Sequence, residues 1–215
     1  MIKTTQFWLI RHGETQWNAD KRLQGWMDIP LNSIGIKQAQ RLAEHLRSAS
    51  FDAPIDLVLS SDLARAAETA RIAAGHLGFP VQACTELRER SFGIYEGQDW
   101  VALDGLKGEH GLDFRDPDQF IEQGETLKAF QERISAAFED LAQRYKGRNI
   151  LVFSHGGVID IVWRKVSKTS IQAPRLDLIL NTSINHFSID EDRNWRAIDW
   201  GQVEHLESEA LDDIG

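Results

Sequence analysis

The stretch QFWLIRHGET, residues 6–15, decides the fold of this chain. Its first half is a short, mostly apolar run, and such a run is typical of a buried strand. Its second half turns polar at once, with an arginine, a histidine and a glycine at positions 11–13. Because open α/β sheets bind ligands beyond the carboxyl ends of their strands, this stretch predicts a strand that leads directly into a functional site.

Two later stretches repeat this pattern. Residues 57–59 form an apolar run that leads into SSDLAR at 60–65, and residues 150–153 form another that leads into SHGG at 154–157. Apolar residues at helical spacing, with capping and stop residues, predict four helices: 33–48, from a cap at Asp62 to about 77, 125–146, and from Gly156 to about 166. Two further strands are expected at about 177–189 and 195–200, joined by a turn at 190–194. The alternation predicts an α/β fold with a largely parallel sheet.

The length of 215 residues predicts a single domain spanning 1–215. Residues 97–124 follow neither the helix nor the strand pattern, and this long polar stretch is predicted to form a lid or a pocket wall. Residues 201–215 form an acidic tail, which we expect to be a solvated end. A tail that binds a partner is the alternative.

Composition excludes several classes of function. The chain has 24 Lys and Arg against 33 Asp and Glu, a net charge of −9, whereas a nucleic-acid-binding chain carries a basic face. The same charge disfavours binding to an anionic membrane surface. No apolar run approaches the ~18 residues of a membrane span, and the run at 7–10 is too short for a signal-peptide core. The single cysteine, Cys84, excludes an internal disulfide and a cysteine-based zinc site and favours a cytoplasmic location.

The three strand ends together predict a phosphate site. If the strands are parallel neighbours, Arg11, His12, Arg65 and His155 converge in a cationic pocket. A glycine follows each histidine and lets backbone N–H groups approach a ligand. Each histidine or arginine alone is more often structural, so the residues by themselves leave both interpretations open. No HExxH spacing indicates a metal, and no GxSxG turn indicates a serine hydrolase.

Five motifs in chain order resemble the histidine phosphatase superfamily, the phosphoglycerate mutase-like proteins. They are LIRHGETQWN at 9–18, SSDLARAAETA at 60–70, LRERSFGIYEG at 87–97, GET at 124–126 and SHGG at 154–157. The resemblance covers roughly residues 7–190. It implies a three-layer sandwich, with helices on both faces of a mostly parallel central sheet.

The resemblance also implies a covalent phosphohistidine mechanism. His12 matches the nucleophile, and its other ring nitrogen should donate to a backbone carbonyl. Arg11, Arg65 and a protonated His155 are expected to keep His12 unprotonated and to stabilise the phosphoryl group. Glu89 matches the general acid, although on its own it reads as a surface residue in an Arg-Glu-Arg run.

Further residues match positions that line the substrate pocket in relatives, namely Asn18, Gln24, Gly25 and Gly156. The implied substrate is a small-molecule phosphomonoester. Neither a metal nor another cofactor is expected, because the protein itself supplies the positive charge.

Phosphatases and mutases share these residues, so the choice depends on residues 98–124. This segment holds seven carboxylates against Lys107 and Arg115, which favours a phosphatase, with broad specificity left open, and argues against a doubly phosphorylated substrate. Phosphatases specialised for fructose 2,6-bisphosphate or for a cobalamin-precursor phosphate remain open. A cofactor-dependent phosphoglycerate mutase is the main alternative, since Arg90 could grip a substrate carboxylate. A silent phosphate- or protein-binding module is the third. The seven tryptophans also leave a homodimer open.

Overall fold

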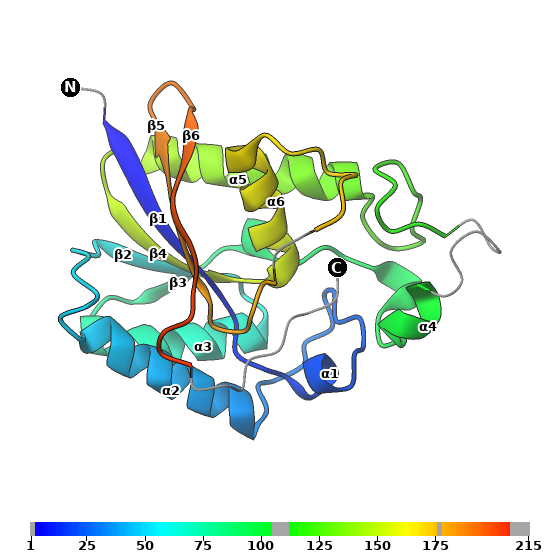
Figure 1. Ribbon diagram of the computed structural model, residues 1–215, viewed down its shortest axis with the longest axis horizontal. Coiled ribbons are helices and arrows are strands. Elements are labelled where there is room, and N and C mark those ends of the chain that lie inside the picture. The colour runs from blue at the N-terminus through cyan, green and yellow to red at the C-terminus, as the bar shows by residue number, and fades with distance from the viewer. Residues whose placement is uncertain (1–2, 105–111, 176–177, 207–215) are drawn as a thin grey trace.

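The computed structural model describes residues 3–104, 112–175 and 178–206. Six strands form one sheet in the order β3-β2-β4-β1-β5-β6 (Figure 1). Their bounds are β1 Thr4–Arg11, β2 Leu57–Ser60, β3 Val81–Ala83, β4 Asn149–Ser154, β5 Ile184–Asp190 and β6 Trp195–Gln202. The strands β3, β2, β4 and β1 are parallel, and β5 and β6 add an antiparallel edge. The prediction of an α/β fold with a mostly parallel sheet is confirmed.

Helices cover both faces of the sheet (Figure 1). The helices α2 Ser33–Arg47 and α3 Ala64–Ala74 cover one face, and α5 Leu127–Arg144 and α6 Gly156–Ser167 cover the other. The short helices α1 Gln16–Ala19 and α4 Trp100–Asp104 lie beyond the sheet (Figure 1). One core cluster joins Trp8 and Ile10 of β1 to α2 and α3, and the other joins Phe7 and Leu9 to α5 and α6. Successive residues of β1 therefore point into opposite cores, as expected of a central strand in a three-layer sandwich.

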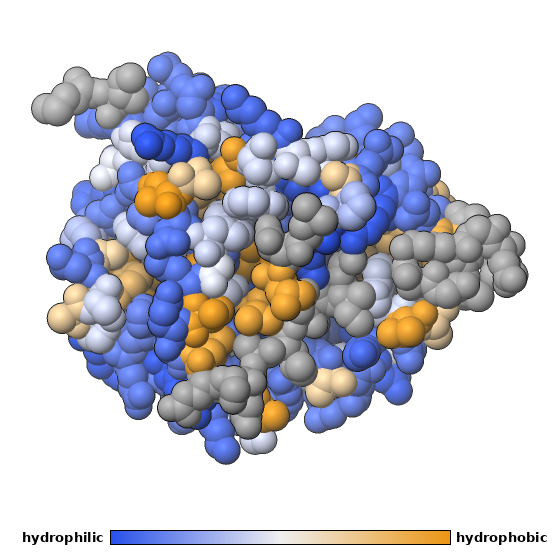
Figure 2. All heavy atoms as spheres, in the orientation of Figure 1, coloured by the Kyte–Doolittle hydropathy of each residue, from blue (hydrophilic) through white to orange (hydrophobic). Residues whose placement is uncertain are grey.

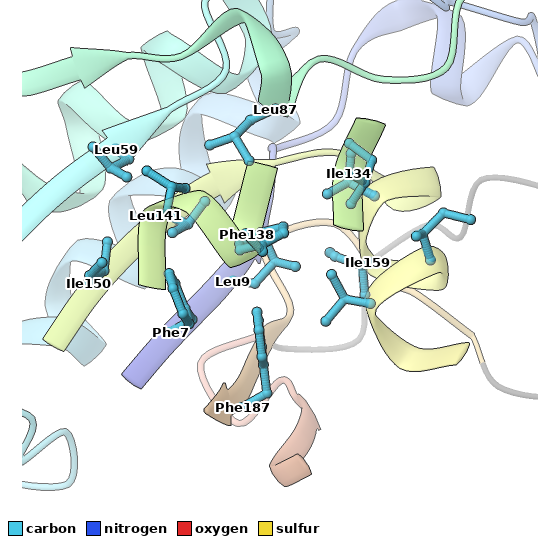
Figure 3. Close-up of a cluster of buried hydrophobic side chains, with 14 of the residues drawn as sticks. Phe7, Leu9, Leu59, Leu87, Ile134, Phe138, Leu141, Ile150, Ile159 and Phe187 are labelled. Atoms are coloured by element: carbon cyan, nitrogen blue, oxygen red, sulfur yellow. The ribbon is translucent and has the colours of Figure 1, made fainter. Parts of the chain in front are cut away.

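An aromatic cluster fixes β1 between α5 and β5. Figure 3 shows Phe7, Phe138 and Phe187 pointing toward one another. The ring centroids of Phe7 lie 5.4 Å from Phe138 and 5.1 Å from Phe187, within the range of favourable aromatic pairs. With β1 held there, its last residue, Arg11, pairs in register with Ser154 of β4. The packing of the core thus places the two His-Gly motifs side by side.

Several predicted boundaries need correction. Asp62 does not cap α3, because the helix starts at Ala64 and the Asp62 carboxylate instead accepts from Arg88 Nε at 2.7 Å. The helix predicted at 125–146 starts after Thr126, whose hydroxyl accepts from the Ala129 amide at 3.0 Å. The strand predicted from 177 starts only at Ile184, and β3 was not predicted at all. Asp62 has a partner that is distant in sequence and β3 has only three residues, whereas the other two boundaries were predicted too early along the chain.

The segment 97–124 builds a small core of its own. It contributes α4, and its buried side chains pack with Leu23 in a cluster of six: Leu23, Trp100, Leu103, Leu112, Phe114 and Ile121. Residues 105–111 of the predicted lid lie outside the described residues. The described part therefore forms a packed wall rather than an open polar loop.

The acidic tail predicted at 201–215 is described only to residue 206. In that part β6 continues to Gln202, and His205 lies 3.2 Å from the Thr182 hydroxyl, so these residues pack against the domain. The strand β6 is the edge of the sheet, and its register against β5 shifts twice. Across the described helices, none combines the length and hydropathy of a membrane span. The face in Figure 2 is mostly hydrophilic, with hydrophobic residues gathered in small groups.

Candidate active site

The carboxyl ends of β1, β2 and β4 meet at one edge of the sheet, as the sequence predicts. They bring together Arg11, His12, Arg65 and His155, none of which is more than 2% exposed. The ring centroids of His12 and His155 are 5.3 Å apart, and Arg65 Nε lies 3.3 Å from His12 Nε2. Two buried arginines beside two buried imidazoles make a site that favours a bound anion.

The His12 ring is oriented and electrically neutral. Its Nδ1 lies 2.7 Å from the Gly13 carbonyl oxygen, so Nδ1 carries the proton and donates it there. This tautomer leaves a lone pair on Nε2. Burial lowers the pKa of His12 well below its ordinary value, and the charges of Arg65 and Arg11 lower it further. His12 therefore presents an unprotonated ring nitrogen at neutral pH, which is the state that a nitrogen nucleophile requires.

Arg65 is anchored by the loop that follows α1. Its Nη1 donates to the Met27 carbonyl at 3.0 Å, and its Nη2 donates to the Gly25 carbonyl at 2.8 Å. Gly25 has a φ of +51°, and a side chain there would lie 2.1 Å from Glu96 Oε1. Position 25 therefore requires a glycine, because the positive φ disfavours other residues and because a side chain would collide with Glu96. The same backbone turn places the Gly25 carbonyl where it accepts from Arg65.

His155 corrects one expectation from the sequence. Its Nε2 lies 2.8 Å from the Ser61 hydroxyl, and it is fully buried. Burial lowers its pKa well below the ordinary value, and Arg65, His12, Arg11 and Arg133 lower it further. The prediction that His155 is protonated is therefore wrong, because its ring is buried and its neighbours are cationic.

Glu89 is held at the N-terminus of α6. Its Oε2 accepts from the Gly157 amide at 2.9 Å, and its Oε1 accepts from the Arg90 amide at 2.8 Å. A Cβ at Gly157 would lie only 2.1 Å from Glu89 Oε1, so the close approach requires a glycine. The alternative of a solvated surface glutamate does not fit this geometry, because both carboxylate oxygens have amide partners.

A cavity of about 130 Å³ joins these groups. His12, Arg65 and Glu89 line it together with the four predicted binding residues Asn18, Gln24, Gly25 and Gly156. The amide oxygens of Asn18 and Gln24 both accept from Thr15, at 2.9 Å in each case, which ties the two side chains to the motif that carries His12. Among the described residues, no group of three or more His, Cys, Asp and Glu forms a metal site.

Arg90, the remaining predicted binding residue, does not line this cavity. Its Nε donates to the Glu125 carbonyl at 3.0 Å and its Nη1 to the Phe114 carbonyl at 2.7 Å. Burial lowers its pKa to about 10. Within the described part of the chain, its buried Nη2 has no hydrogen-bond partner. In this state Arg90 ties the wall to the segment that carries Glu89.

Sequence reasoning missed an ion pair beneath Glu89. Arg133 Nη2 lies 2.7 Å from Glu125 Oε2, and the same guanidinium donates to the carbonyls of Glu86, Arg88 and Glu89 at 2.7, 3.0 and 3.0 Å. The sequence carried no clear signal for this pair, because Glu125 lies before the start of α5 whereas Arg133 lies within the helix. This ion pair holds in place the backbone at Glu89, the residue that matches the general acid.

Sequence reasoning also missed the cations at the cavity. Lys21, Arg22 and Arg175 line it, whereas none of the described carboxylates of 98–124 does. The described carboxylates of the acidic segment therefore do not contribute to the cavity wall, and they give no support to the argument against a doubly phosphorylated substrate. The signal was absent from the sequence, because these cations come from two distant loops.

A sequence profile of the histidine phosphatase superfamily (branch 1) matches residues 7–208. The chain belongs to this superfamily. It is 36% identical to phosphoglycerate mutase-like protein 4 of Arabidopsis thaliana, over 93% of this chain and 86% of the relative. It is 33% identical to a metal-independent phosphoserine phosphatase of the same plant, over 96% of this chain and 85% of the relative.

Solved structures of this superfamily share the fold. A mutant phosphoserine phosphatase from Entamoeba histolytica, in complex with phosphoserine, gives a TM-score of 0.78 at 28% identity and covers 94% of this chain and 100% of its own. A mycobacterial glucosyl-3-phosphoglycerate phosphatase gives 0.79 at 26% identity, with the same coverage. The resemblance drawn from the five motifs is confirmed. The chain is an enzyme of a superfamily that contains both phosphatases and mutases.

Proposed function

We propose that this histidine phosphatase hydrolyses small phosphomonoesters through a covalent phosphohistidine at His12. The observation that carries the proposal is the state of His12. Its Nδ1–H is bound to the Gly13 carbonyl, and its Nε2 faces Arg65 in the cavity that Glu89 also lines. A nucleophile, an anion-binding guanidinium and a carboxyl group in one cavity are the parts that phosphoryl transfer needs.

In the first step, the lone pair of His12 Nε2 attacks phosphorus as the bond from phosphorus to the ester oxygen breaks. The departing alkoxide takes the proton of the Glu89 carboxyl group and leaves as an alcohol. The phosphoryl group is then bonded to Nε2, and the imidazole carries a positive charge. The Gly13 carbonyl, which accepts from Nδ1–H, stabilises that charge.

In the second step, the Glu89 carboxylate takes a proton from water, and the resulting hydroxide attacks phosphorus. The bond from phosphorus to Nε2 breaks, and its electron pair returns to the ring. Inorganic phosphate leaves, with His12 neutral and Glu89 protonated again. Both steps spread charge over the three phosphoryl oxygens, where Arg11, Arg65 and the N-terminus of α6 provide fixed positive potential.

Hydrolysis of p-nitrophenyl phosphate in the presence of EDTA tests the proposal. We expect activity with EDTA, and we expect it to fall at least about 1,000-fold in His12→Ala. His45→Ala is the matched control, because His45 contacts Phe51 and His205 and does not line the cavity. A rapid quench in alkaline detergent should trap a phosphoryl group on the wild-type chain that is lost on later treatment with acid, and this group should be absent from His12→Ala. Activity retained in His12→Ala would overturn the mechanism.

A mutase is the second candidate, and one observation favours it. Lys21, Arg22 and Arg175 line the cavity, and a phosphoacid substrate would use such cations. An assay of 3-phosphoglycerate isomerisation, primed with 2,3-bisphosphoglycerate, separates the two. If isomerisation is faster than hydrolysis, the protein is a mutase and the proposal of a phosphatase is overturned. We also place the protein in the cytoplasm, on the ground of its single cysteine.

A further inference from the structure

A second cavity adjoins the first at Glu89. Its volume is about 100 Å³. The two cavities share six lining residues, which are Glu89, Phe92, Trp100, Gly157, Asp160 and Arg175. The space around His12 and Arg65 therefore continues past the proposed general acid into a separate compartment.

The wall of this second cavity is apolar. Besides the shared aromatic rings, it is formed by Phe114, Leu127, Phe130, Ile161 and Ile171. Phe92 and Phe114 pack edge to face, with ring centroids 5.6 Å apart. The rings come from the segment 92–114, and the aliphatic side chains come from α5, α6 and the loop at 171. These residues form a wall that favours an apolar group over a hydroxylated one.

The wall of this cavity is largely apolar even though arginines line part of it. Arg90 is engaged by the Glu125 and Phe114 carbonyls, and Arg164 donates to Asp160 Oδ2 at 2.8 Å and to the Ala173 carbonyl at 2.9 Å. Arg115 donates to the same Ala173 carbonyl at 3.4 Å. Because most of these charged ends are engaged by protein carbonyls or by Asp160, the three side chains line the cavity largely with their aliphatic stems. Arg90 Nη2, which has no hydrogen-bond partner among the described residues, is the exception.

We propose that this second cavity binds the alcohol part of the substrate and selects a small apolar or aromatic group. The inference rests on the proposed function, because Glu89 must reach the ester oxygen to protonate it. With phosphorus at His12 and the ester oxygen at Glu89, the carbon chain of the alcohol continues into the compartment on the far side of Glu89. A polyol there would lose water and find few partners.

The size of the cavity limits the occupant. An apolar cavity of roughly 150 Å³ holds one benzene molecule, so a compartment of about 100 Å³ that opens into the first cavity admits one ring or a short branched chain. Two fused rings exceed it. The substrate class is therefore the phosphomonoesters of small apolar or benzyl-type alcohols.

Binding of phosphonates, which cannot be hydrolysed, tests the cavity without depending on turnover. We expect calorimetry to give a dissociation constant for benzylphosphonate about 10-fold or more below that for 3-hydroxypropylphosphonate. Among substrates, benzyl phosphate should exceed glycerol 3-phosphate in kcat/KM by a similar factor. Both leaving groups are alkoxides, so the comparison does not simply report leaving-group reactivity.

Variants of the wall residues test whether the preference for benzylphosphonate arises in the second cavity. Ile171→Asn places a polar group in the wall at a half-buried loop position, and it should reduce the preference for benzylphosphonate at least about 5-fold while binding of 3-hydroxypropylphosphonate stays the same. Leu178→Asn is the matched control, because Leu178 is 69% exposed in the same loop and lines neither cavity. If Ile171→Asn does not fold, as judged by thermal unfolding, Leu127→Asn replaces it.

The outcomes separate the two proposals. Equal affinity for the two phosphonates, or a preference that neither wall variant changes, would overturn the inference even if the protein is an active phosphatase. A preference for benzylphosphonate that the wall variants reduce, in a protein that hydrolyses no phosphomonoester, would support the cavity and overturn the proposed function.

Discussion

The two cavities that meet at Glu89 are built in different ways. The first rests on the ends of three neighbouring parallel strands, where Arg11, His12 and His155 lie at or one residue beyond a strand and Arg65 lies in the first turn of the helix that follows. The second takes most of its wall from aromatic and aliphatic side chains of four separate parts of the chain, and of these side chains only Phe92 lies within one of the five motifs. The comparison teaches that the chemistry depends on a rigid edge of the sheet, whereas selection of the substrate depends on loops and helix faces packed beside it.

The largest effect should come from changing Glu89, the residue at which the two cavities meet. Glu89→Gln should lower kcat/KM for an alkyl phosphate by about 100- to 10,000-fold, because the alkoxide then leaves without a proton. The loss should be much smaller with p-nitrophenyl phosphate, whose leaving group is stable as an anion. Steady-state kinetics on both substrates measure the difference, and Glu86→Gln, outside both cavities, is the control. Equal losses on the two substrates would contradict the role of Glu89 as a proton donor.

A smaller effect should follow from crowding Glu89 out of its place. In Gly157→Ala the new methyl group would lie 2.1 Å from Glu89 Oε1, so the carboxylate must move away from the α6 N-terminus. We expect kcat to fall about 100-fold with little change in thermal unfolding. Gly75→Ala is the matched control, since no atom lies within 4 Å of a Cβ there. Wild-type kcat in Gly157→Ala would show that the contact at α6 is not needed.

The first cavity should also make stability depend on pH. His12 and His155 have lowered pKa values because of burial and of Arg65, whereas in the unfolded chain they titrate near pH 6.5. Above that pH both states are neutral, and the free energy of unfolding does not change. Below it only the unfolded chain gains protons, so the free energy of unfolding should fall by up to about 1.4 kcal/mol per pH unit for each histidine.

Urea denaturation between about pH 7.5 and 5.5 measures this loss. His155→Asn should reduce the slope without abolishing it, since His12 remains. His186 and His205, whose pKa values burial also lowers, contribute as well. Carboxylates such as Asp62, whose pKa is lowered by Arg88, add a further loss only near and below pH 4. A stability that is unchanged down to pH 5.5 would mean that the histidines are protonated in the folded protein.

The smallest of these effects should come from the ion pair under Glu89. Arg133→Met removes the donors to the carbonyls of Glu86, Arg88 and Glu89, and we expect kcat to fall about 10-fold with KM unchanged. The loss should be larger for alkyl phosphates than for p-nitrophenyl phosphate, as for Glu89→Gln, and Arg133→Lys should restore part of it. Arg144→Met, which breaks an exposed pair on the same helix, is the control. A loss that is equal for all substrates would indicate a purely structural role.

The difference between the cavities also explains what the sequence could predict. The apolar run before Arg11-His12 and the one before Ser154-His155 are local signals, and parallel strands bring their ends together whatever the rest of the chain does. These runs predicted the fold and the meeting of the three strand ends, whereas Glu89, Asn18, Gln24 and Gly25 of the first cavity followed only from the resemblance to the superfamily. The cations Lys21, Arg22 and Arg175 were missed, because their meeting depends on how two distant loops lie over the sheet.

The charge state of His155 shows a second limit. A histidine beside a phosphate site reads as protonated, but full burial among three arginines lowers its pKa. That outcome depends on the distances and solvent exposure of the surrounding groups, which no motif contains. The apolar wall of the second cavity was hidden for the same reason, since Leu127, Ile161 and Ile171 look like ordinary core residues in their own segments.

The irregular pairing of β6 has a consequence for how copies of this protein behave at high concentration. An edge strand offers a row of unused backbone groups, and a flat, regular edge recruits strands from other molecules and leads to aggregation. Here the register shifts between Ile184, His186 and Phe187 interrupt the regular ladder, and Arg196 and Asp199 add charge along β6. The long edge of the sheet is thereby a poor template for intermolecular strand pairing, which helps the chain to stay dispersed.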